Sequence, residues 1–256
     1  MIQRGSYERD GLRLSYLADG PQGAPVIVFV HGWPAAAVTW QPQLEAFAKA
    51  GFRTVAPDLR GYGESAAPAQ PSAYAQSELV ADMLALLEHL GRRSAVWVGH
   101  DWGCATVFAL AAHHPAAVDA VTGLAVGYRT LDRGYRHMLG RVDRDTYPAE
   151  SHPLAQFDYM AFYEAQPERA TEVLDADVDA SVRALFRSGD PTTAGVPGPT
   201  SGHTRAGGWF GGAERAPDVP LDRRVLDDDL HRAQSPTTRR PVSRSPCGNS
   251  ATTSPR

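Results

Sequence analysis

The first half of the chain alternates short apolar runs with helical stripes of apolar residues. The runs are rich in β-branched residues, which is typical of strands buried in a parallel sheet, and they lie at residues 25–32, 52–58, 94–99 and 118–126. Apolar spacing of three and four predicts helices at residues 40–51, 77–91 and 104–115, the first of them burying Leu44, Phe47 and Ala48. Alternation around Asp10-Gly11 predicts an N-terminal β-hairpin. This order predicts an α/β fold, with a mostly parallel sheet and helices on both faces.

The pattern changes after residue 127, where strands stop and helices and loops follow. Residues 171–190 place Leu174, Val178, Val182 and Leu185 on one helical face, whereas the Gly- and Pro-rich residues 189–220 are expected to be irregular. From residue 231, Arg, Ser, Pro and Thr supply 18 of 26 residues, and such a segment buries too little apolar surface to fold. We therefore predict a core over residues 1–127, a helical cap over 128–230 and a disordered polar tail over 231–256.

Length and composition suit one soluble α/β domain with an insertion. The 256 residues carry a net charge of −4 with both signs interspersed, so nothing indicates a nucleic-acid partner. No apolar run approaches a membrane span, and the N-terminus lacks the apolar stretch of a signal peptide, so we expect a cytoplasmic protein. The two cysteines, Cys104 and Cys247, lie far apart and predict neither a disulfide nor a metal site.

The segment "VGHDWGC", residues 98–104, joins a predicted strand to a predicted helix. Gly99 and Gly103 permit the tight turn of a nucleophile elbow, which would present Asp101 at the carboxyl edge of the sheet. The alternative is an ordinary turn in which Asp101 only caps the following helix.

A second motif, "HGWP", follows the first buried strand. A loop of this kind supplies one backbone N–H of an oxyanion hole, and the residue after the nucleophile supplies the other, so the donors would be Trp33 and Trp102. His31 is expected to support the loop structurally, and a cis peptide bond before Pro34 is compatible with such a turn.

With "HGWP", "APDLRGYGES" and "VGHDWG" in view, the chain resembles the epoxide hydrolases of the α/β-hydrolase superfamily over residues 1–230. The stretch "FDYMAFYEAQPERA" is similar to the epoxide hydrolase cap, in which the Tyr after Phe-Asp donates a hydrogen bond to the epoxide oxygen. The resemblance thus assigns this role to Tyr159, with Tyr163 as the fallback. Both could instead be aromatic residues of the cap core.

The resemblance implies that Asp101 attacks an epoxide carbon and forms an alkyl ester, which water hydrolyses to a diol without a metal or organic cofactor. The substrate is expected to be a small apolar epoxide, with Phe157, Phe162 and Tyr163 lining the pocket. Asp58 and the "RGYGES" loop are interpreted as structural. The oligomeric state is not predicted.

The second half of that reaction needs a His base and an acid, which in this family follow the cap. Here only His231 stands at the start of the polar tail, and no acidic residue follows Asp229. His203 and His231 are weak candidates for the base and Asp132 for the acid. We therefore predict that the chain is truncated or frame-shifted after about residue 230, that it lacks the last strands, and that turnover is impaired. A haloalkane dehalogenase and a non-catalytic remnant are the alternatives.

Overall fold

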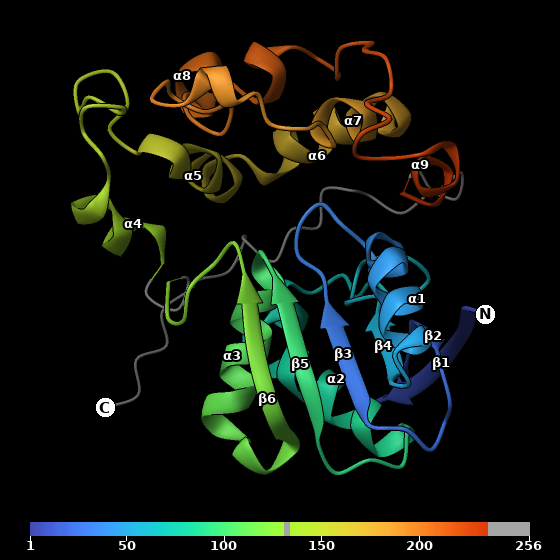
Figure 1. Ribbon diagram of the computed structural model, residues 1–256. Coiled ribbons are helices and arrows are strands. Elements are labelled where there is room, and N and C mark those ends of the chain that lie inside the picture. The colour runs from blue at the N-terminus through green and yellow to red at the C-terminus, as the bar shows by residue number, and fades with distance from the viewer. Residues whose placement is uncertain (131–133, 235–256) are drawn as a thin grey trace. The chain divides into compact units, whose positions relative to one another are not determined.

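The computed structural model describes residues 1–130 and 134–234, in which the chain divides into two units, Met1–Asp132 and Arg133–Arg256. The division falls a few residues after the boundary predicted at residue 127. All the strands of the described residues belong to the first unit, and the second consists of helices and loops (Figure 1).

The first unit is built on one six-stranded sheet with the order β1-β2-β4-β3-β5-β6. Strands β3, β4, β5 and β6 run parallel, and the N-terminal hairpin joins them antiparallel through β2 and β4. The hairpin turns at Asp10 and Gly11, whose φ angles of 51° and 74° are those of a type I′ turn, as the sequence predicted. The strands are β1 (Gln3–Arg9), β2 (Leu12–Asp19), β3 (Val26–Val30), β4 (Arg53–Pro57), β5 (Ala95–His100) and β6 (Val118–Leu124).

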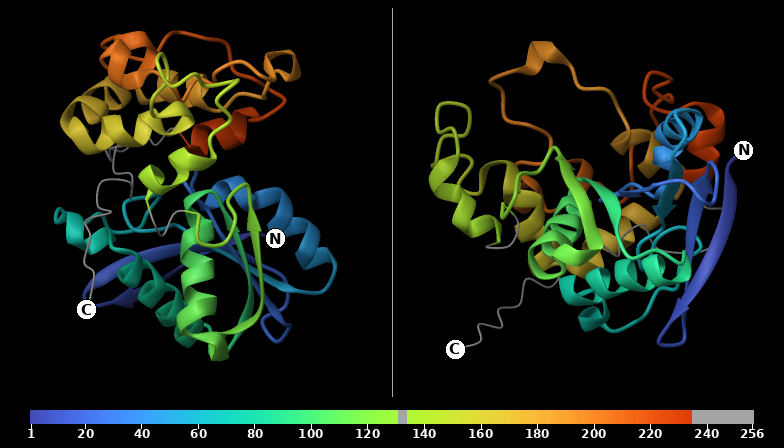
Figure 2. Two further views of the ribbon diagram at one scale, coloured as in Figure 1. Left: turned by 90° about the vertical axis from the view of Figure 1, so that its left-hand side faces the viewer. Right: turned by 60° about the horizontal axis from the view of Figure 1, so that its bottom comes forward.

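Three helices cover the two faces of this sheet (Figure 1; Figure 2). Helices α2 (Gln76–His89) and α3 (Trp102–His113) pack on one face, and α1 (Gln41–Lys49) packs on the other. Short 3-10 helices lie at Ala37–Trp40, Pro71–Tyr74 and Pro115–Ala117. The predicted α/β-hydrolase architecture, a mostly parallel sheet with helices on both faces, is confirmed.

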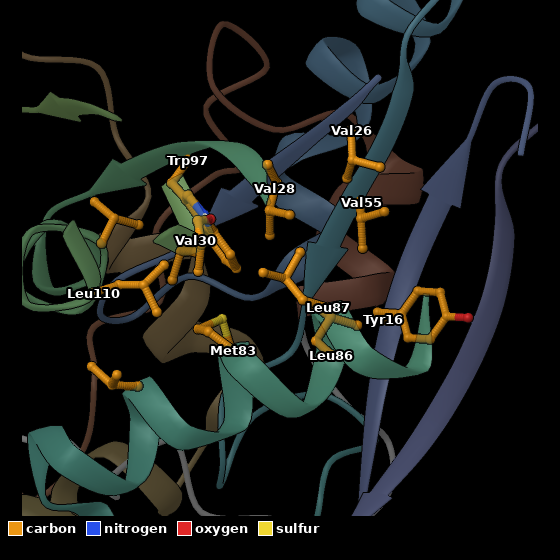
Figure 3. Close-up of a cluster of buried hydrophobic side chains, with 14 of the residues drawn as sticks. Tyr16, Val26, Val28, Val30, Val55, Met83, Leu86, Leu87, Trp97 and Leu110 are labelled. Atoms are coloured by element: carbon orange, nitrogen blue, oxygen red, sulfur yellow. The ribbon is translucent and has the colours of Figure 1, made fainter. Parts of the chain in front are cut away.

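The larger hydrophobic core lies between the sheet and α2 with α3 (Figure 3). Val28 and Val30 of β3, Trp97 of β5 and Met83 of α2 are almost completely buried there. A smaller core on the opposite face gathers around Leu44 of α1. Burial on both faces explains why the central strands read as continuous apolar runs in the sequence.

Of the three residues that the sequence placed on the buried face of α1, two are not buried, and Ala48 is half-buried. Phe47 is 41% exposed, whereas Leu44 is fully buried. The Phe47 ring contacts Phe29 and Phe52 at centroid distances of 5.7 and 6.2 Å. Phe47 lies at the rim of the smaller core. Apolar spacing predicts which face of a helix is apolar, but it does not tell which residues of that face lie in the interior and which lie at the rim.

Strand β6 forms one edge of the sheet, and none of its residues is buried. On the neighbouring strand β5, Trp97 faces the larger core, while Val96 and Val98 on the opposite face are only half-buried. Within residues 1–130 and 134–234, no strand follows β6 along the chain.

The second unit is helical, as predicted, but its apolar stripe is divided between two helices. Helix α6 (Pro167–Asp175) ends before Asp177, whose side chain accepts a hydrogen bond from the Ala180 N–H at 2.9 Å and begins α7 (Val178–Leu185). The N-cap preference of Asp therefore overrides the continuous spacing. The other helices are α4 (Tyr135–Met138), α5 (Asp158–Ala165), α8 (His203–Ala206) and α9 (Asp228–Gln234), with 3-10 helices at Leu139–Arg141, Ala155–Phe157, Pro191–Thr193 and Trp209–Gly212.

Helix α9 extends to Gln234, so the first four residues of the predicted disordered tail are helical. The rest of that tail, with Cys247, lies outside the described residues. None of the helices in the described part of the chain has the length and apolar character needed to cross a bilayer.

Candidate active site

Asp101 stands alone between the end of β5 and the first residue of α3, in a strained conformation with φ 52° and ψ −124°. A positive φ is uncommon for a residue with a side chain, and it is typical of a nucleophile elbow. A Cβ at Gly99 would lie 2.7 Å from the Gly103 carbonyl oxygen, and one at Gly103 would lie 2.7 Å from the His31 carbonyl oxygen. Only glycine fits at both positions, which explains the spacing seen in the sequence.

The Asp101 carboxylate contacts the "HGWP" loop rather than capping α3. Its Oδ1 accepts a hydrogen bond from the Trp33 backbone N–H at 2.9 Å, and no side-chain capping bond to α3 forms. Burial raises the pKa of this carboxyl above its ordinary value, while the N–H groups of Trp102 and Trp33 and the nearby His100 oppose that rise. The contacts therefore differ from those of an ordinary helix cap.

The "HGWP" loop is fixed by its buried histidine. The His31 Nε2 accepts a hydrogen bond from the Leu59 N–H at 3.0 Å, so its Nδ1 carries the proton and donates to the Gly32 carbonyl at 2.9 Å. Burial lowers the pKa of His31, which favours this neutral form. The Trp33–Pro34 peptide bond is cis. His31 thus joins the loop after β3 to the loop after β4.

Gly32 lets this loop approach the elbow closely. A Cβ at this position would lie 2.6 Å from both the Asp101 Cβ and the Trp102 backbone nitrogen. Gly32 is the Gly of "HGWP", and its close approach to the elbow was not predicted from that motif.

Asp58 and the loop that follows it brace the same region. Its two carboxylate oxygens accept hydrogen bonds from the Ser15 hydroxyl at 2.7 Å and from the Ala37 N–H at 3.0 Å. Arg60 and Asp82 form a buried bidentate pair at 2.5 and 2.8 Å, which ties the loop to α2. These contacts agree with the structural interpretation of this segment.

The end of β6 supports the elbow from its other side. The Asp101 N–H donates to the Leu124 carbonyl at 3.2 Å, and the buried Cys104 thiol donates to the carbonyls of Gly99 and Leu124, both at 3.2 Å. Burial raises the pKa of the Cys104 thiol, which keeps it protonated and able to donate. The elbow therefore rests on backbone groups of both neighbouring strands.

The second unit gathers the aromatic residues expected in the cap. Tyr159 and Tyr163, both on α5, lie in an edge-to-face contact at 6.4 Å between centroids, and the Trp209 ring lies 6.4 and 6.1 Å from theirs. Phe157 and Tyr159 are half-buried, whereas Phe162 and Tyr163 are buried. Trp209 was missed from the sequence, because a single Trp in a Gly-rich segment carries no periodic signal.

The comparisons with known proteins decide the family. The sequence model of the alpha/beta hydrolase fold family matches residues 25–183, more than half of the chain. The chain belongs to this family. The predicted resemblance to epoxide hydrolases is also confirmed, because the relatives that match the chain are epoxide hydrolases. By family, therefore, this α/β-hydrolase is an enzyme.

Two curated relatives are similar over the first part of this α/β-hydrolase. Epoxide hydrolase A of Mycobacterium tuberculosis is 43% identical over 119 residues, which are 46% of this chain and 37% of that protein. An epoxide hydrolase of Caballeronia sordidicola is 46% identical over 158 residues, which are 61% of this chain and 45% of that protein. The matched stretch thus spans less than half the length of these relatives.

Solved structures of epoxide hydrolases are similar over nearly the whole chain. Epoxide hydrolase A from Mycobacterium thermoresistibile superposes with a TM-score of 0.74 at 30% identity, covering 97% of this chain and 74% of that one. An epoxide hydrolase from Vigna radiata gives a TM-score of 0.70 at 25% identity, with coverages of 97% and 72%.

The weak base and acid candidates of this α/β-hydrolase lie in different surroundings. His203 is buried with its ring 4.2 Å from that of Trp209, and burial lowers its pKa. His231 on α9 lies 3.2 Å from the Asp179 carboxylate. Asp132 lies outside the described residues. Across the described part of the chain, no cluster of three or more His, Cys, Asp or Glu residues could hold a metal ion.

Proposed function

We propose that this α/β-hydrolase opens small apolar epoxides through Asp101. The observation that carries the proposal is the strained elbow that presents Asp101 with one carboxylate oxygen on the Trp33 N–H. Serine at this position would suit an acyl carbon, but an epoxide carbon is saturated and is attacked in line with its C–O bond. A carboxylate can make that attack without first losing a proton.

The first half-reaction uses the carboxylate oxygen that the loop leaves available. Oδ1 is held by Trp33, so Oδ2 attacks the epoxide carbon, the C–O bond breaks, and an alkyl ester forms on Asp101. The epoxide oxygen leaves as an alkoxide, for which Tyr159 supplies the hydrogen bond and the proton, with Tyr163 as the fallback. Phe157 and Phe162 belong to the same proposed pocket.

The second half-reaction is the hydrolysis of that ester. Water gives a proton to a base and attacks the ester carbonyl, whose oxygen becomes an oxyanion next to the N–H groups of Trp33 and Trp102. Collapse of this intermediate breaks the ester C–O bond, and the leaving oxygen takes the proton of the new carboxyl group, so that the diol is released and the carboxylate is restored. The base then returns its proton to the Tyr159 phenolate. His203 is a poor base because it is buried against Trp209. His231 pairs with Asp179, but it stands at the start of the polar tail and not on a loop after a late strand, where the resemblance places the base. We therefore propose that ester hydrolysis is the impaired step.

The direct test is diol formation from styrene oxide, measured by chromatography. We expect slow diol formation by the native chain and none by Asp101→Asn, since the amide is a poor nucleophile. Asp119→Asn, which changes an exposed carboxylate on β6, is the matched control and should retain the native rate.

Halide release from a bromoalkane distinguishes the second candidate function. Trp102 follows Asp101 directly, and its indole N–H is the kind of donor that holds a leaving halide in a dehalogenase. Halide release without diol formation would favour that reaction. Neither product, together with no ester on Asp101, would contradict both functions.

A further inference from the structure

A polar cavity of about 400 Å³ lies at the end of the parallel strands opposite Asp101. Val26 and Arg53, the first residues of β3 and β4, pair with each other and line it. Asp101 follows the last residue of β5, which runs parallel to β3. The cavity is therefore separate from the candidate active site.

Two arginines on this cavity are held by backbone carbonyls alone. Arg53, which is only 9% exposed, donates from Nη1 to the Gly20 carbonyl at 2.9 Å. Arg92 donates from Nη2 to the Ala24 carbonyl at 3.1 Å and to the Gln22 carbonyl. Within residues 1–130 and 134–234, neither guanidinium forms an ion pair, although an arginine carries five N–H donors.

The Asp19 carboxylate, which interacts electrostatically with Arg53, already has other partners. Asp19 accepts from the Met1 ammonium at 2.7 Å and from the Gly20 N–H at 2.8 Å, and it does not line the cavity. Since neither guanidinium has a direct ion pair among the described residues, an anion bound in the cavity would give both arginines one.

Tyr16 and His89 complete the polar wall. The Tyr16 hydroxyl and His89 Nε2 are joined by a hydrogen bond of 3.1 Å. Figure 3 shows the Tyr16 ring at the margin of the larger core, with its hydroxyl pointing away from the apolar side chains. The site therefore combines two permanent cations with a phenol and an imidazole, and none of its lining residues is acidic.

We propose that this cavity binds the phosphate group of a small molecule. Planar guanidinium groups match phosphate oxygens in geometry and charge, and two of them suit its double charge better than that of a carboxylate. The volume lies in the range of small-molecule sites and exceeds the needs of a bare phosphate ion, so a small phosphate monoester fits best.

Isothermal titration calorimetry of the full chain tests this, at constant ionic strength in chloride buffer. The probes are glycerol 3-phosphate, inorganic phosphate and acetate. We expect saturable one-to-one binding of glycerol 3-phosphate, with acetate failing to saturate. Saturation by inorganic phosphate as well would show that the free ion suffices. The absence of saturation with both phosphates would overturn the proposal, as would equal binding of acetate.

Matched variants locate the binding. Arg92→Gln should raise the dissociation constant about tenfold or more, because a charged hydrogen bond is lost. Arg93→Gln, which changes the exposed neighbouring residue, should leave the dissociation constant within about twofold of the native value. Tyr16→Phe removes only a hydroxyl and serves if Arg92→Gln does not fold. If Arg92→Gln folds, equal weakening of phosphate binding by Arg92→Gln and Arg93→Gln would contradict the proposed site. If Arg92→Gln does not fold, unchanged phosphate binding by Tyr16→Phe would contradict it. Asp101→Asn should bind phosphate as the native chain does.

Discussion

Strands β3 and β6 lie in the same parallel sheet but in opposite environments. All five residues of β3 are buried, because α2 and α3 cover one face, α1 covers the other, and β4 and β5 flank it. None of the seven residues of β6 is buried, and within the described residues β5 alone pairs with it. Burial thus follows both the surroundings of the two strands and their composition, since β3 is wholly apolar and β6 carries Asp119 and Thr122.

The candidate nucleophile stands at the border between these two environments. The loop after β3 supplies the Trp33 N–H to the Asp101 side chain, and the end of β6 supplies the Leu124 carbonyl to its backbone N–H. The β3 side is rigidly packed, so we attribute the position of the carboxylate mainly to that side. The β6 side is the weaker support.

The largest contrast is expected between two leucine truncations. Leu44→Ala removes a fully buried side chain from the smaller core and should lower the free energy of unfolding by about 2–5 kcal/mol. Leu124→Ala on β6 starts from 42% exposure and should cost about 0.5 kcal/mol or less. Urea denaturation of both variants measures the difference, and equal losses would show that the edge is packed as well as the centre.

Asp101→Asn should stabilise the fold while abolishing the chemistry. Burial raises the pKa of Asp101, so the folded chain binds a proton more tightly than the unfolded chain. Stability from this group is therefore present at low pH and falls as pH rises from its ordinary pKa to the raised one. At pH 7 the neutral amide avoids that loss, and we expect a gain of about 0.5–2 kcal/mol.

Urea denaturation of Asp101→Asn and of the native chain at pH 4 and pH 7 tests how the stability gain depends on pH. The gain should be larger at pH 7. A larger gain at pH 4 would mean that hydrogen bonds to the charged carboxylate outweigh its burial.

Thr122→Lys should change association rather than stability. Thr122 is exposed on β6, and a lysine on an edge strand opposes pairing with another chain. Because the β6 edge is open within the described residues, we expect the native chain to self-associate and Thr122→Lys to do so less in sedimentation velocity, with a change in unfolding free energy within about 0.5 kcal/mol. Unchanged association would show that the β6 edge does not mediate it.

Local signals were sufficient to predict much of the first unit. Asp10-Gly11 predicted the hairpin, the apolar runs predicted the parallel strands, and Gly99 with Gly103 predicted the elbow, because each feature is set by neighbouring residues. The contact between Trp33 and Asp101 was anticipated only through two motifs taken together.

Features that depend on residues far apart in the sequence could not be predicted from it. The exposure of Phe47 depends on how far the sheet extends beneath α1, and Trp209 meets Tyr159 only through folding of the second unit. The carbonyl of Leu124 beneath the elbow has no side-chain signature at all. Backbone contacts and the rim of a core are set by tertiary structure, not by local pattern.

The measurement that tests the central claim most directly is intact-mass spectrometry after incubation with an aryl epoxide, with peptide mapping of any adduct. We predict one added epoxide mass on Asp101, absent in Asp101→Asn and retained in Asp119→Asn, which would place the nucleophile at the elbow. An adduct on another residue, or one that persists in Asp101→Asn, would contradict the account.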